Sequence, residues 1–184
     1  SLGLPLMVKP ASEGSSVGMS KVRKVQDLEE AYALAANYDP LVIAEQFIEG
    51  QEFTAGILGH DTLPLIRLET PRDFYDYQAK YLASDTRYIL PCGLPKSAED
   101  AIRAEALRAF DALGCRAWGR ADIMVDGAGK AYFLEINTSP GMTDHSLVPM
   151  AACHAGISYE DLCLRVLDSA RLNAALSEGG EHVG

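Results

Sequence analysis

Hydrophobic positions alternate in some stretches of the chain and recur every three or four residues in others, which predicts a mixed α and β fold. The predicted strands are residues 4–8, 41–48, 52–58, 63–69, 118–125 and 130–136. The predicted helices begin near Asp27, Ser97, Leu147 and Ser158. Asp27 and Ser97 each precede an acidic residue at capping-box spacing, which favours a helix start there. The strands at 52–58 and 63–69 are expected to form a hairpin around residues 59–61.

The two longer amphipathic patterns predict one buried apolar stripe on each helix. The stripes are Leu28, Ala31, Tyr32 and Ala35 on the first helix, and Ile102, Ala106, Phe110 and Leu113 on the second. Residues 11–18 form a Ser- and Gly-rich loop. Residues 71–88 are rich in tyrosine and have no clear period, which predicts a long ordered loop. Residues 176–184 predict a frayed tail.

Composition narrows the range of functions. The 184 residues are 48% hydrophobic and carry a net charge of -10, which argues against a nucleic-acid partner because phosphate contacts need surplus Lys and Arg. Apolar runs are far shorter than the roughly 20 residues of a membrane span, so no membrane partner is expected. Four cysteines without C-x-x-C spacing predict buried free thiols and a cytoplasmic location. They are Cys92, Cys115, Cys153 and Cys163.

The clearest hairpin joins the strands at 118–125 and 130–136. If Asp126–Gly129 form a four-residue loop, Val125 lies opposite Lys130, and alternation fixes which face each side chain takes. One face then carries Arg120, Asp122, Met124, Phe133 and Glu135. The other, apolar face carries Ala121, Ile123, Val125, Leu134 and Ile136. We expect the first face to carry chemistry and the second to join the core.

The polar face of this hairpin indicates a metal site. Asp122, Glu135 and Asn137 would bring two carboxylates and an amide oxygen together, and Mg2+ prefers such ligands. Arg120 beside them would supply a positive charge for an anionic oxygen. The same pattern is typical of a cross-strand ion pair on a solvated sheet face, so alternation alone leaves both interpretations open.

A second candidate site lies where Lys9 ends the first strand. The Ser- and Gly-rich loop after it could surround a phosphate, or it could be only a structural turn; it matches neither Walker A nor G-x-G-x-x-G. Gly14–Gly18 does match the G-x-S-x-G nucleophile elbow, and Asp122 and His145 follow in the order of a serine hydrolase. That alternative is disfavoured because residues 19–25 alternate like a strand, whereas the elbow needs a helix.

The ordered motifs together resemble those of D-alanine:D-alanine ligases, from about residue 4 to residue 170. The motifs are Lys9, Glu13–Gly18, Glu45–Ile48, Phe74–Tyr81, Gly119–Asp122, Glu135–Thr143 and His145–Pro149. The resemblance implies an α+β ATP-grasp fold, in which two lobes with largely antiparallel sheets hold ATP between them. Residues 1–50 would be the second half of the central lobe, residues 51–175 the C-terminal lobe with the metal and substrate site, and residues 176–184 a flexible tail.

The resemblance also implies roles for individual residues. The nucleotide-binding residues would be Lys9, Met7, Glu45, Phe47, Ile48, Glu52, Phe74, Lys80, Met124 and Leu134. Leu134 lies on the wrong face of the simple hairpin register, so a bulge is expected there. The metal ligands would be Asp122, Glu135 and Asn137, and the oxyanion stabilisers Arg120 and the amide of Gly141. Tyr81 would link its loop to Ser15, and Ser146 with the amide of Leu147 would hold the carboxylate of the second alanine.

The implied reaction joins two D-alanine molecules at the expense of ATP, with two Mg2+ ions or Mn2+ as a substitute, for peptidoglycan precursor synthesis. One carboxylate takes the γ-phosphoryl group, and the amine of the second alanine attacks the acyl phosphate. The segment with Lys80 and Tyr81 would close as a lid and exclude water. Tyr81 in place of Phe favours dipeptide formation over lactate acceptance. The full-length enzyme is expected to be a homodimer.

The family has an N-terminal domain and the first half of the central lobe, which carry further substrate and nucleotide groups. Nothing before Ser1 supplies them, so we expect this chain to be a catalytically incomplete fragment. Another ATP-grasp carboxylate–amine ligase is the first alternative, and Phe74–Tyr81 with His145–Leu147 argues against it. A non-catalytic nucleotide-binding module is the second, and the presence of Arg120 and Asp122 argues against that.

Overall fold

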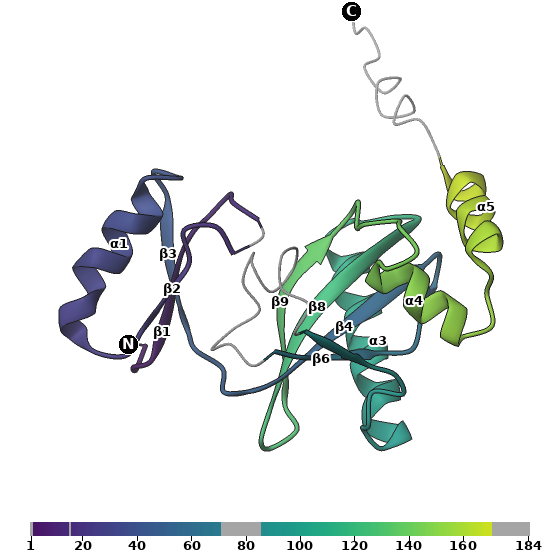
Figure 1. The fold of residues 1–184 in the computed structure, drawn as a ribbon, viewed down its shortest axis with the longest axis horizontal. Coiled ribbons are helices and arrows are strands. Elements are labelled where there is room, and N and C mark those ends of the chain that lie inside the picture. Colours follow the sequence, from purple (N-terminus) through teal and green to yellow (C-terminus); the bar gives the residue numbers. More distant parts are fainter. Residues whose placement is uncertain (1, 15, 71–85, 171–184) are drawn as a thin grey trace, which may run out of the picture. The chain divides into compact units, whose positions relative to one another are not determined.

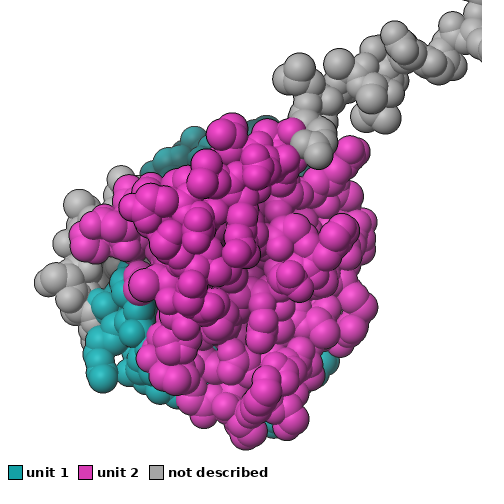
Figure 2. Space-filling model, turned by 90° about the vertical axis from the view of Figure 1, so that its right-hand side faces the viewer, with its two compact units in different colours: residues 1–53, 67–89, 123–132 teal, residues 54–66, 90–122, 133–184 magenta. Residues whose placement is uncertain are grey.

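The structure is a computed structural model that describes residues 2–14, 16–70 and 86–170. The chain divides into two compact units, each made of three segments (Figure 2). Unit 1 consists of residues 1–53, 67–89 and 123–132, and unit 2 consists of residues 54–66, 90–122 and 133–184. The predicted domain boundary after residue 50 lies near the end of the first segment of unit 1, and it stays a prediction.

Unit 1 contains a three-stranded antiparallel sheet with one helix packed on it (Figure 1). The strand order is β2 (Ser20–Val22), β1 (Leu6–Pro10) and β3 (Val42–Gln46), and the helix is α1 (Leu28–Ala36), preceded by a 3-10 helix, η1 (Val25–Asp27). The core between sheet and helix consists of Val8, Val22, Ala31 and Ala35. Since side chains alternate along β1, Met7 and Lys9 point to the face away from α1.

Two of the four positions predicted to be buried on α1 are exposed. Ala31 and Ala35 are buried, but Leu28 and Tyr32 are 39% and 55% exposed. Three strands are too few to cover the whole stripe, so Leu28 and Tyr32 line an open cavity of about 460 Å³ between α1 and β3. The predicted capping box is also wrong. Asp27 is the N-cap but makes no side-chain capping bond, since η1 already holds it in the right-handed helical region.

The second sheet carries the chemistry-bearing hairpin. Its strand order is β7 (Arg87–Ile89), β6 (Ile66–Glu69), β4 (Gly50–Leu58), β8 (Trp118–Asp126) and β9 (Ala131–Asn137), with β5 (Asp61–Thr62) also paired to β4. The strand predicted at 63–69 begins only at Ile66, in β6. Residues 63–65 connect β5 to β6, where Pro64 has no amide to donate to the ladder. The end of the loop predicted at 71–88 is also different, since Arg87 and Tyr88 belong to β7. Residues 71–85 lie outside the described residues.

In the described part of the chain, three helices accompany this sheet: α3 (Lys96–Ala112), α4 (Leu147–His154) and α5 (Tyr159–Ser169). The predicted stripe of α3 is confirmed at Ile102, Ala106 and Phe110. Leu113 is 68% exposed, because it is the C-cap residue and lies beyond the last packed turn. A core cluster in unit 2 joins α4 and α5 to the sheet through Leu63, Ile66, Val148, Ala151, Ala152 and Leu162.

The capping box predicted at Ser97 does not form. The helix begins one residue earlier, and the carbonyl of Pro95 accepts the amides of Ala98 and Glu99. The carboxylate of Asp100 pairs with Lys96 at 2.9 Å instead of reaching back to the helix start.

The hairpin between β8 and β9 closes one residue away from the predicted register. The Asp126 amide donates to the Lys130 carbonyl, and the Gly129 amide donates to the Asp126 carbonyl, so Asp126 rather than Val125 lies opposite Lys130. Gly129 takes a φ of 82°, which is typical of a three-residue loop with a glycine bulge. The Asp126 carboxylate also accepts the amides of Lys130 and Ala128, and these bonds lower the pKa of Asp126.

The alternation predicted for β8 holds better than that for β9. Ala121, Ile123 and Val125 are buried as expected, but Leu134, which was predicted on the same apolar face, is 42% exposed. β9 is an edge strand with a single neighbour, so fewer side chains cover it.

All four cysteines lie in the described part of the chain and are free thiols, as predicted. Their predicted burial holds only for Cys92, and Cys153 is exposed on the surface of α4. Among the described helices, none is long and apolar enough to cross a membrane.

Gly119 on β8 leaves space for two neighbours. A Cβ atom there would lie 2.7 Å from the Phe110 ring and 2.9 Å from the Asn137 carbonyl oxygen. We expect Gly119→Ala to lower the free energy of unfolding by about 1–3 kcal/mol, because neither a buried ring nor a backbone carbonyl can move away easily. Urea denaturation measures this. Gly127→Ala is the control, since a Cβ there meets nothing within 4 Å, and equal stability losses in both variants would contradict the prediction.

Candidate active site

Asp122 is the centre of a hydrogen-bonded cluster in unit 2. Its side chain is only 9% exposed, and that of Arg120, two residues before it on β8, is 16% exposed. The guanidinium donates from Nε to Oδ1 at 2.8 Å and from Nη2 to Oδ2 at 2.7 Å. Such a bidentate, charge-assisted pair fixes both side chains, and removing one partner of a buried pair costs about 3–5 kcal/mol.

Asn137 joins the two carboxylates predicted to bind metal. Its Nδ2 donates to Oδ2 of Asp122 at 3.1 Å and to Oε1 of Glu135 at 3.2 Å. The structure therefore brings Asp122, Glu135 and Asn137 together with Arg120. The ion pair between Arg120 and Asp122 joins two residues of the same strand, β8, so it is not the cross-strand pair of the alternative interpretation. A purely solvated face is excluded, because Asp122 is buried.

The meeting of Asn137 with Asp122 requires a break in the alternation of β9. The Tyr132 hydroxyl donates to Asp126 at 3.1 Å, and Asn137 reaches Asp122. The two acceptors are an even number of residues apart on β8, but the two donors are an odd number apart on β9. One extra residue between the donors, as in a β-bulge, accounts for both contacts. The bulge expected near Leu134 from the family resemblance would fall in the same stretch of β9, and it stays a prediction.

Within the described residues, no group of three or more His, Cys, Asp or Glu side chains is placed to hold a metal ion. The ligand set predicted here differs, because it has two carboxylates and one amide. Two carboxylate oxygens converge on a single NH2 group, so one hydrogen-bond donor satisfies both. That convergence fits a hard divalent cation, which also prefers carboxylate and amide oxygens.

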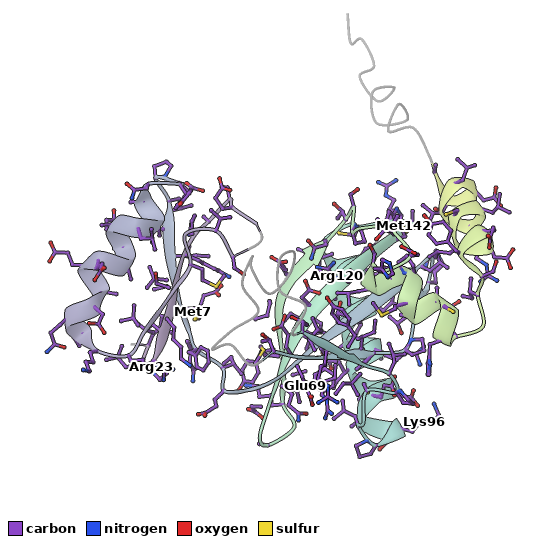
Figure 3. The ribbon with its side chains drawn as sticks, viewed as in Figure 1. Met7, Arg23, Glu69, Lys96, Arg120 and Met142 are labelled. Atoms are coloured by element: carbon purple, nitrogen blue, oxygen red, sulfur yellow. The ribbon has the colours of Figure 1, made fainter. Side chains whose placement is uncertain are left out.

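The loop after β9 is anchored at both ends. Ser146 is the N-cap residue of α4, but its hydroxyl makes no capping bond; it accepts the Thr143 amide at 3.0 Å and lies 2.9 Å from the Thr143 hydroxyl. The Tyr159 hydroxyl of α5 donates to the Met142 carbonyl. A hydrogen bond with Cys163 raises the pKa of Tyr159, which keeps this donor neutral. Figure 3 labels Arg120 on β8 and Met142 in this loop.

Gly141 and Ser146 lie close together within that loop. A Cβ atom on Gly141 would stand 2.8 Å from the Ser146 hydroxyl oxygen. Both residues predicted to hold anionic groups therefore belong to one tightly closed loop, next to the start of α4 at Leu147.

The three-stranded sheet of unit 1 carries three of the predicted nucleotide residues, Met7, Lys9 and Glu45, on its face away from α1. Lys9 Nζ lies 2.7 Å from the Glu45 carboxylate, and Met7 is the cross-strand partner of Glu45. The Phe47 amide donates to the Pro5 carbonyl at 3.1 Å, which continues the alignment of β3 with β1. Lys21, opposite Met7 on β2, stands 3.4 Å from the centre of the Phe47 ring. The sequence analysis did not single out Lys21.

The base of the Ser- and Gly-rich loop is fixed by Asp39. This buried carboxylate accepts the Ser12 amide and the Leu41 amide, each at 2.8 Å. Both bonds favour the charged form and lower the pKa of Asp39, and the Leu41 amide is the larger cause. Asp39 was missed because it reads as part of a helix-ending turn. The strand β2 follows the loop, so the helix that a nucleophile elbow needs is absent there, as the sequence predicted.

The remaining predicted site residues are not brought to the Asp122 cluster by any contact described above. Ile48, Glu52 and Met124 are half-buried, and Leu134 is exposed. Ser15, Phe74, Lys80 and Tyr81 lie outside the described residues.

The comparisons with known proteins agree with this geometry. The sequence profile of the family described as "D-ala D-ala ligase C-terminus" matches residues 1–168. The chain belongs to this family. It is 58% identical over 175 residues to the D-alanine–D-alanine ligase of Alkalilimnicola ehrlichii, covering 95% of this chain and 56% of that protein. Over 171 residues it is 53% identical to D-alanine–D-alanine ligase B of Chromobacterium violaceum, covering 93% and 56%.

Solved ligase structures match the fold as well. The VanG D-Ala:D-Ser ligase from Enterococcus faecalis matches with a TM-score of 0.83 and 33% identity, over 91% of this chain and 50% of that one. The ATP complex of the Bacillus anthracis D-alanine–D-alanine ligase matches with a TM-score of 0.77 and 30% identity, over 91% and 52%. The predicted α+β ATP-grasp class is confirmed. The chain spans about half the length of the curated relatives it matches.

Asp39 should make the stability of this family member depend on acid pH. Because the folded state lowers the pKa of Asp39, its contribution is present above the unfolded value of about 4 and is lost as the pH falls through the lower folded value. We expect Asp39→Asn to lower the urea midpoint at pH 7 and to narrow this difference from the wild type below pH 4. Asp61→Asn, at the exposed start of β5, is the control. A difference that stays constant from pH 7 to pH 3 would contradict the prediction.

Proposed function

We propose that this chain is the ATP- and metal-binding part of an enzyme that joins two D-alanine molecules into D-alanyl-D-alanine for peptidoglycan synthesis. The observation that carries the proposal is the buried Arg120–Asp122 pair with Asn137 and Glu135, in a chain that matches the ligase family over residues 1–168. A phosphoryl-transfer ligase needs such a cluster, because its rate comes mainly from positioning and from neutralised phosphate charge.

Asp122, Glu135 and Asn137 would hold Mg2+, two ions in the proposed complex, with Mn2+ as a substitute. Bound metal would supply charge neutralisation for the ATP phosphates. The Asn137 amide now presents Nδ2 to both carboxylates, and rotation about its terminal bond would present Oδ1 instead. The same side chain would thus serve as a donor in the metal-free chain and as an oxygen ligand in the complex.

The nucleotide would lie on the face of the unit 1 sheet that carries Met7, Lys9 and Glu45. In the nucleotide-free chain, Lys9 and Glu45 neutralise each other at 2.7 Å, and the Glu45 side chain is 47% exposed. ATP would separate them, with Lys9 turning to a phosphate and Glu45 accepting from the adenine amino group. Ile48 and Phe47 would lie beside the base, and Glu52 would bind the ribose. Phe74, Met124 and Leu134 would complete the apolar walls.

The chemistry would then proceed in two steps. A carboxylate oxygen of the first D-alanine bonds to the γ-phosphorus and ADP leaves. The amine of the second D-alanine attacks the carbonyl carbon and inorganic phosphate leaves. Arg120 and the Gly141 amide would stabilise the anionic oxygens, and Ser146 with the Leu147 amide would hold the second carboxylate.

Several further expectations belong to this proposal. Lys80 and Tyr81 would close over the phosphates, with Tyr81 bonded to Ser15. The two-lobe division after residue 50, the nucleotide between the lobes, the homodimer and the cytoplasmic location are part of the same proposal. We expect catalysis to depend on residues beyond these 184. This expectation is supported by the finding that the chain covers about half of each relative.

D-Alanine is favoured over D-serine as the second substrate. The curated relatives that are 53–58% identical to this chain are named D-alanine–D-alanine ligases, which supports this choice. Another carboxylate–amine ligase is opposed by the same sequence identity. A non-catalytic nucleotide-binding module is opposed by the retained Arg120–Asp122 pair.

Nucleotide binding by the 184-residue chain tests the first half of the proposal. We expect Lys9→Met to weaken ATP binding about tenfold, because one charge-assisted contact to phosphate is lost. Isothermal titration calorimetry with MgATP measures the affinity. Lys130→Met, which removes a cation that lies over the Tyr132 ring, is the control. Equal ATP affinity of Lys9→Met and the wild type would remove Lys9 from the site.

D-Alanine-dependent ADP release tests the second half. We expect it from a chain extended at its N-terminus to the full length of the relatives, and not from the 184 residues alone. Arg120→Ala in the extended chain should lower kcat about 100-fold, because an oxyanion stabiliser is lost. Arg116→Ala, a charge removal near the start of β8, is the control. Unchanged kcat in Arg120→Ala, or D-serine preferred as the second substrate, would overturn the assignment.

A further inference from the structure

Thr54 is a buried polar residue beside the candidate metal site. It lies on β4, next to β8 in the sheet, and is only 1% exposed. Its hydroxyl oxygen lies 2.9 Å from Oδ1 of Asp122 and 3.3 Å from the carbonyl oxygen of Ala121. Both neighbours are hydrogen-bond acceptors, so the single hydroxyl proton can be donated to only one of them.

The Thr54 hydroxyl donates its hydrogen bond to Asp122. The carboxylate oxygen is closer than the carbonyl oxygen by 0.4 Å and carries negative charge, and hydrogen bonds to charged acceptors are about twice as strong as neutral ones. A proton directed to Ala121 would leave two oxygen lone pairs facing each other across 2.9 Å. Because Thr is β-branched, its side chain has few rotamers, so the direction of this bond is well fixed.

Asp122 accepts four hydrogen bonds in the metal-free chain. Oδ1 accepts from Thr54 and from Nε of Arg120, and Oδ2 accepts from Nη2 of Arg120 and from Asn137. A carboxylate has about four acceptor positions, so all of them are used. A metal ion at Oδ2 must displace a donor there, and both candidates, Arg120 and Asn137, are less buried than Thr54. Thr54 acts on the other oxygen, from the buried neighbouring strand.

We propose that Thr54 is a positioning residue for the metal ligand Asp122. Its hydroxyl holds Oδ1 on the β4 side, so that Oδ2 stays directed toward Glu135 when Arg120 or Asn137 releases it. The inference rests on the proposed function, because it takes Asp122, Glu135 and Asn137 as the metal ligands. Outer groups that hold a ligating carboxylate change metal affinity about 10- to 100-fold when they are removed.

The test measures Mn2+ affinity of the 184-residue chain by electron paramagnetic resonance of free Mn2+, without nucleotide. Thr54→Val keeps the shape and removes the hydroxyl, Thr54→Ala removes both, and Thr54→Ser keeps the hydroxyl alone. We expect about tenfold weaker binding in Thr54→Val and Thr54→Ala, and restored binding in Thr54→Ser. Thermal unfolding in EDTA reports the stability of each variant separately. If Thr54→Val does not fold, the Ala and Ser variants decide the question.

Two controls separate positioning from a structural effect and from failure of the proposed site. Thr62→Val makes the same chemical change where the hydroxyl accepts from Arg103, and should leave Mn2+ affinity unchanged. Asp122→Asn should weaken Mn2+ binding strongly. If Asp122→Asn binds Mn2+ weakly while Thr54→Val and Thr54→Ala bind it normally, the role of Thr54 is overturned and the metal site is retained. Losses of Mn2+ affinity in Thr54→Ser and Thr62→Val that equal the loss in Thr54→Val also overturn the role of Thr54. Normal Mn2+ affinity in Asp122→Asn overturns the metal site and the inference together.

Discussion

The buried charge of Asp122 is the constraint on which the candidate site depends. A carboxylate that is only 9% exposed must have its charge and lone pairs satisfied, and three elements meet that need. Arg120 supplies the counter-charge from the same strand, Thr54 reaches across from β4, and Asn137 reaches across from β9. The strand order β4, β8, β9 is what makes all three donors available to one residue. These hydrogen bonds fix the position of the Asp122 carboxylate, which is the property that the proposed metal site requires.

The small sheet of unit 1 shows how strand alternation gives one strand two tasks. On β1, Val8 joins the core under α1, while Met7 and Lys9 face the opposite side and meet Glu45 on β3. The predicted phosphate lysine and the predicted adenine carboxylate neutralise each other there, so neither charge is left unpaired in the nucleotide-free chain. The Ser- and Gly-rich loop begins at the end of the same strand, and Asp39 fixes its first amide. Local hydrogen bonding therefore sets where this loop starts, independently of any ligand.

Function is carried by the site and family together, because neither is sufficient alone. An arginine and an aspartate that pair on a sheet are common, and the cluster by itself does not name a substrate. The family match over residues 1–168 supports the proposed reaction class. The loop from Gly141 to Ser146, closed by Thr143 and bonded to Tyr159, is the proposed place for a second anionic group. The half-length coverage of the relatives explains why activity is proposed for an extended chain.

The sequence by itself determined the α+β class, most of the longer strands and helices and the residues from which the site is drawn, because periodicity and ordered motifs are local properties of the chain. The short strands β5 and β7 were not among the predicted strands. Prediction from the sequence failed where the burial or register of one element depends on another element. Leu28 and Tyr32 stay exposed because the sheet beneath α1 is narrow, and Leu134 is exposed because β9 is an edge strand. The hairpin register shifted by one residue because Gly129 and the Asp126 carboxylate favour a shorter loop. Only the tertiary structure placed Thr54 against Asp122, since the two are 68 residues apart and nothing but strand pairing brings them together.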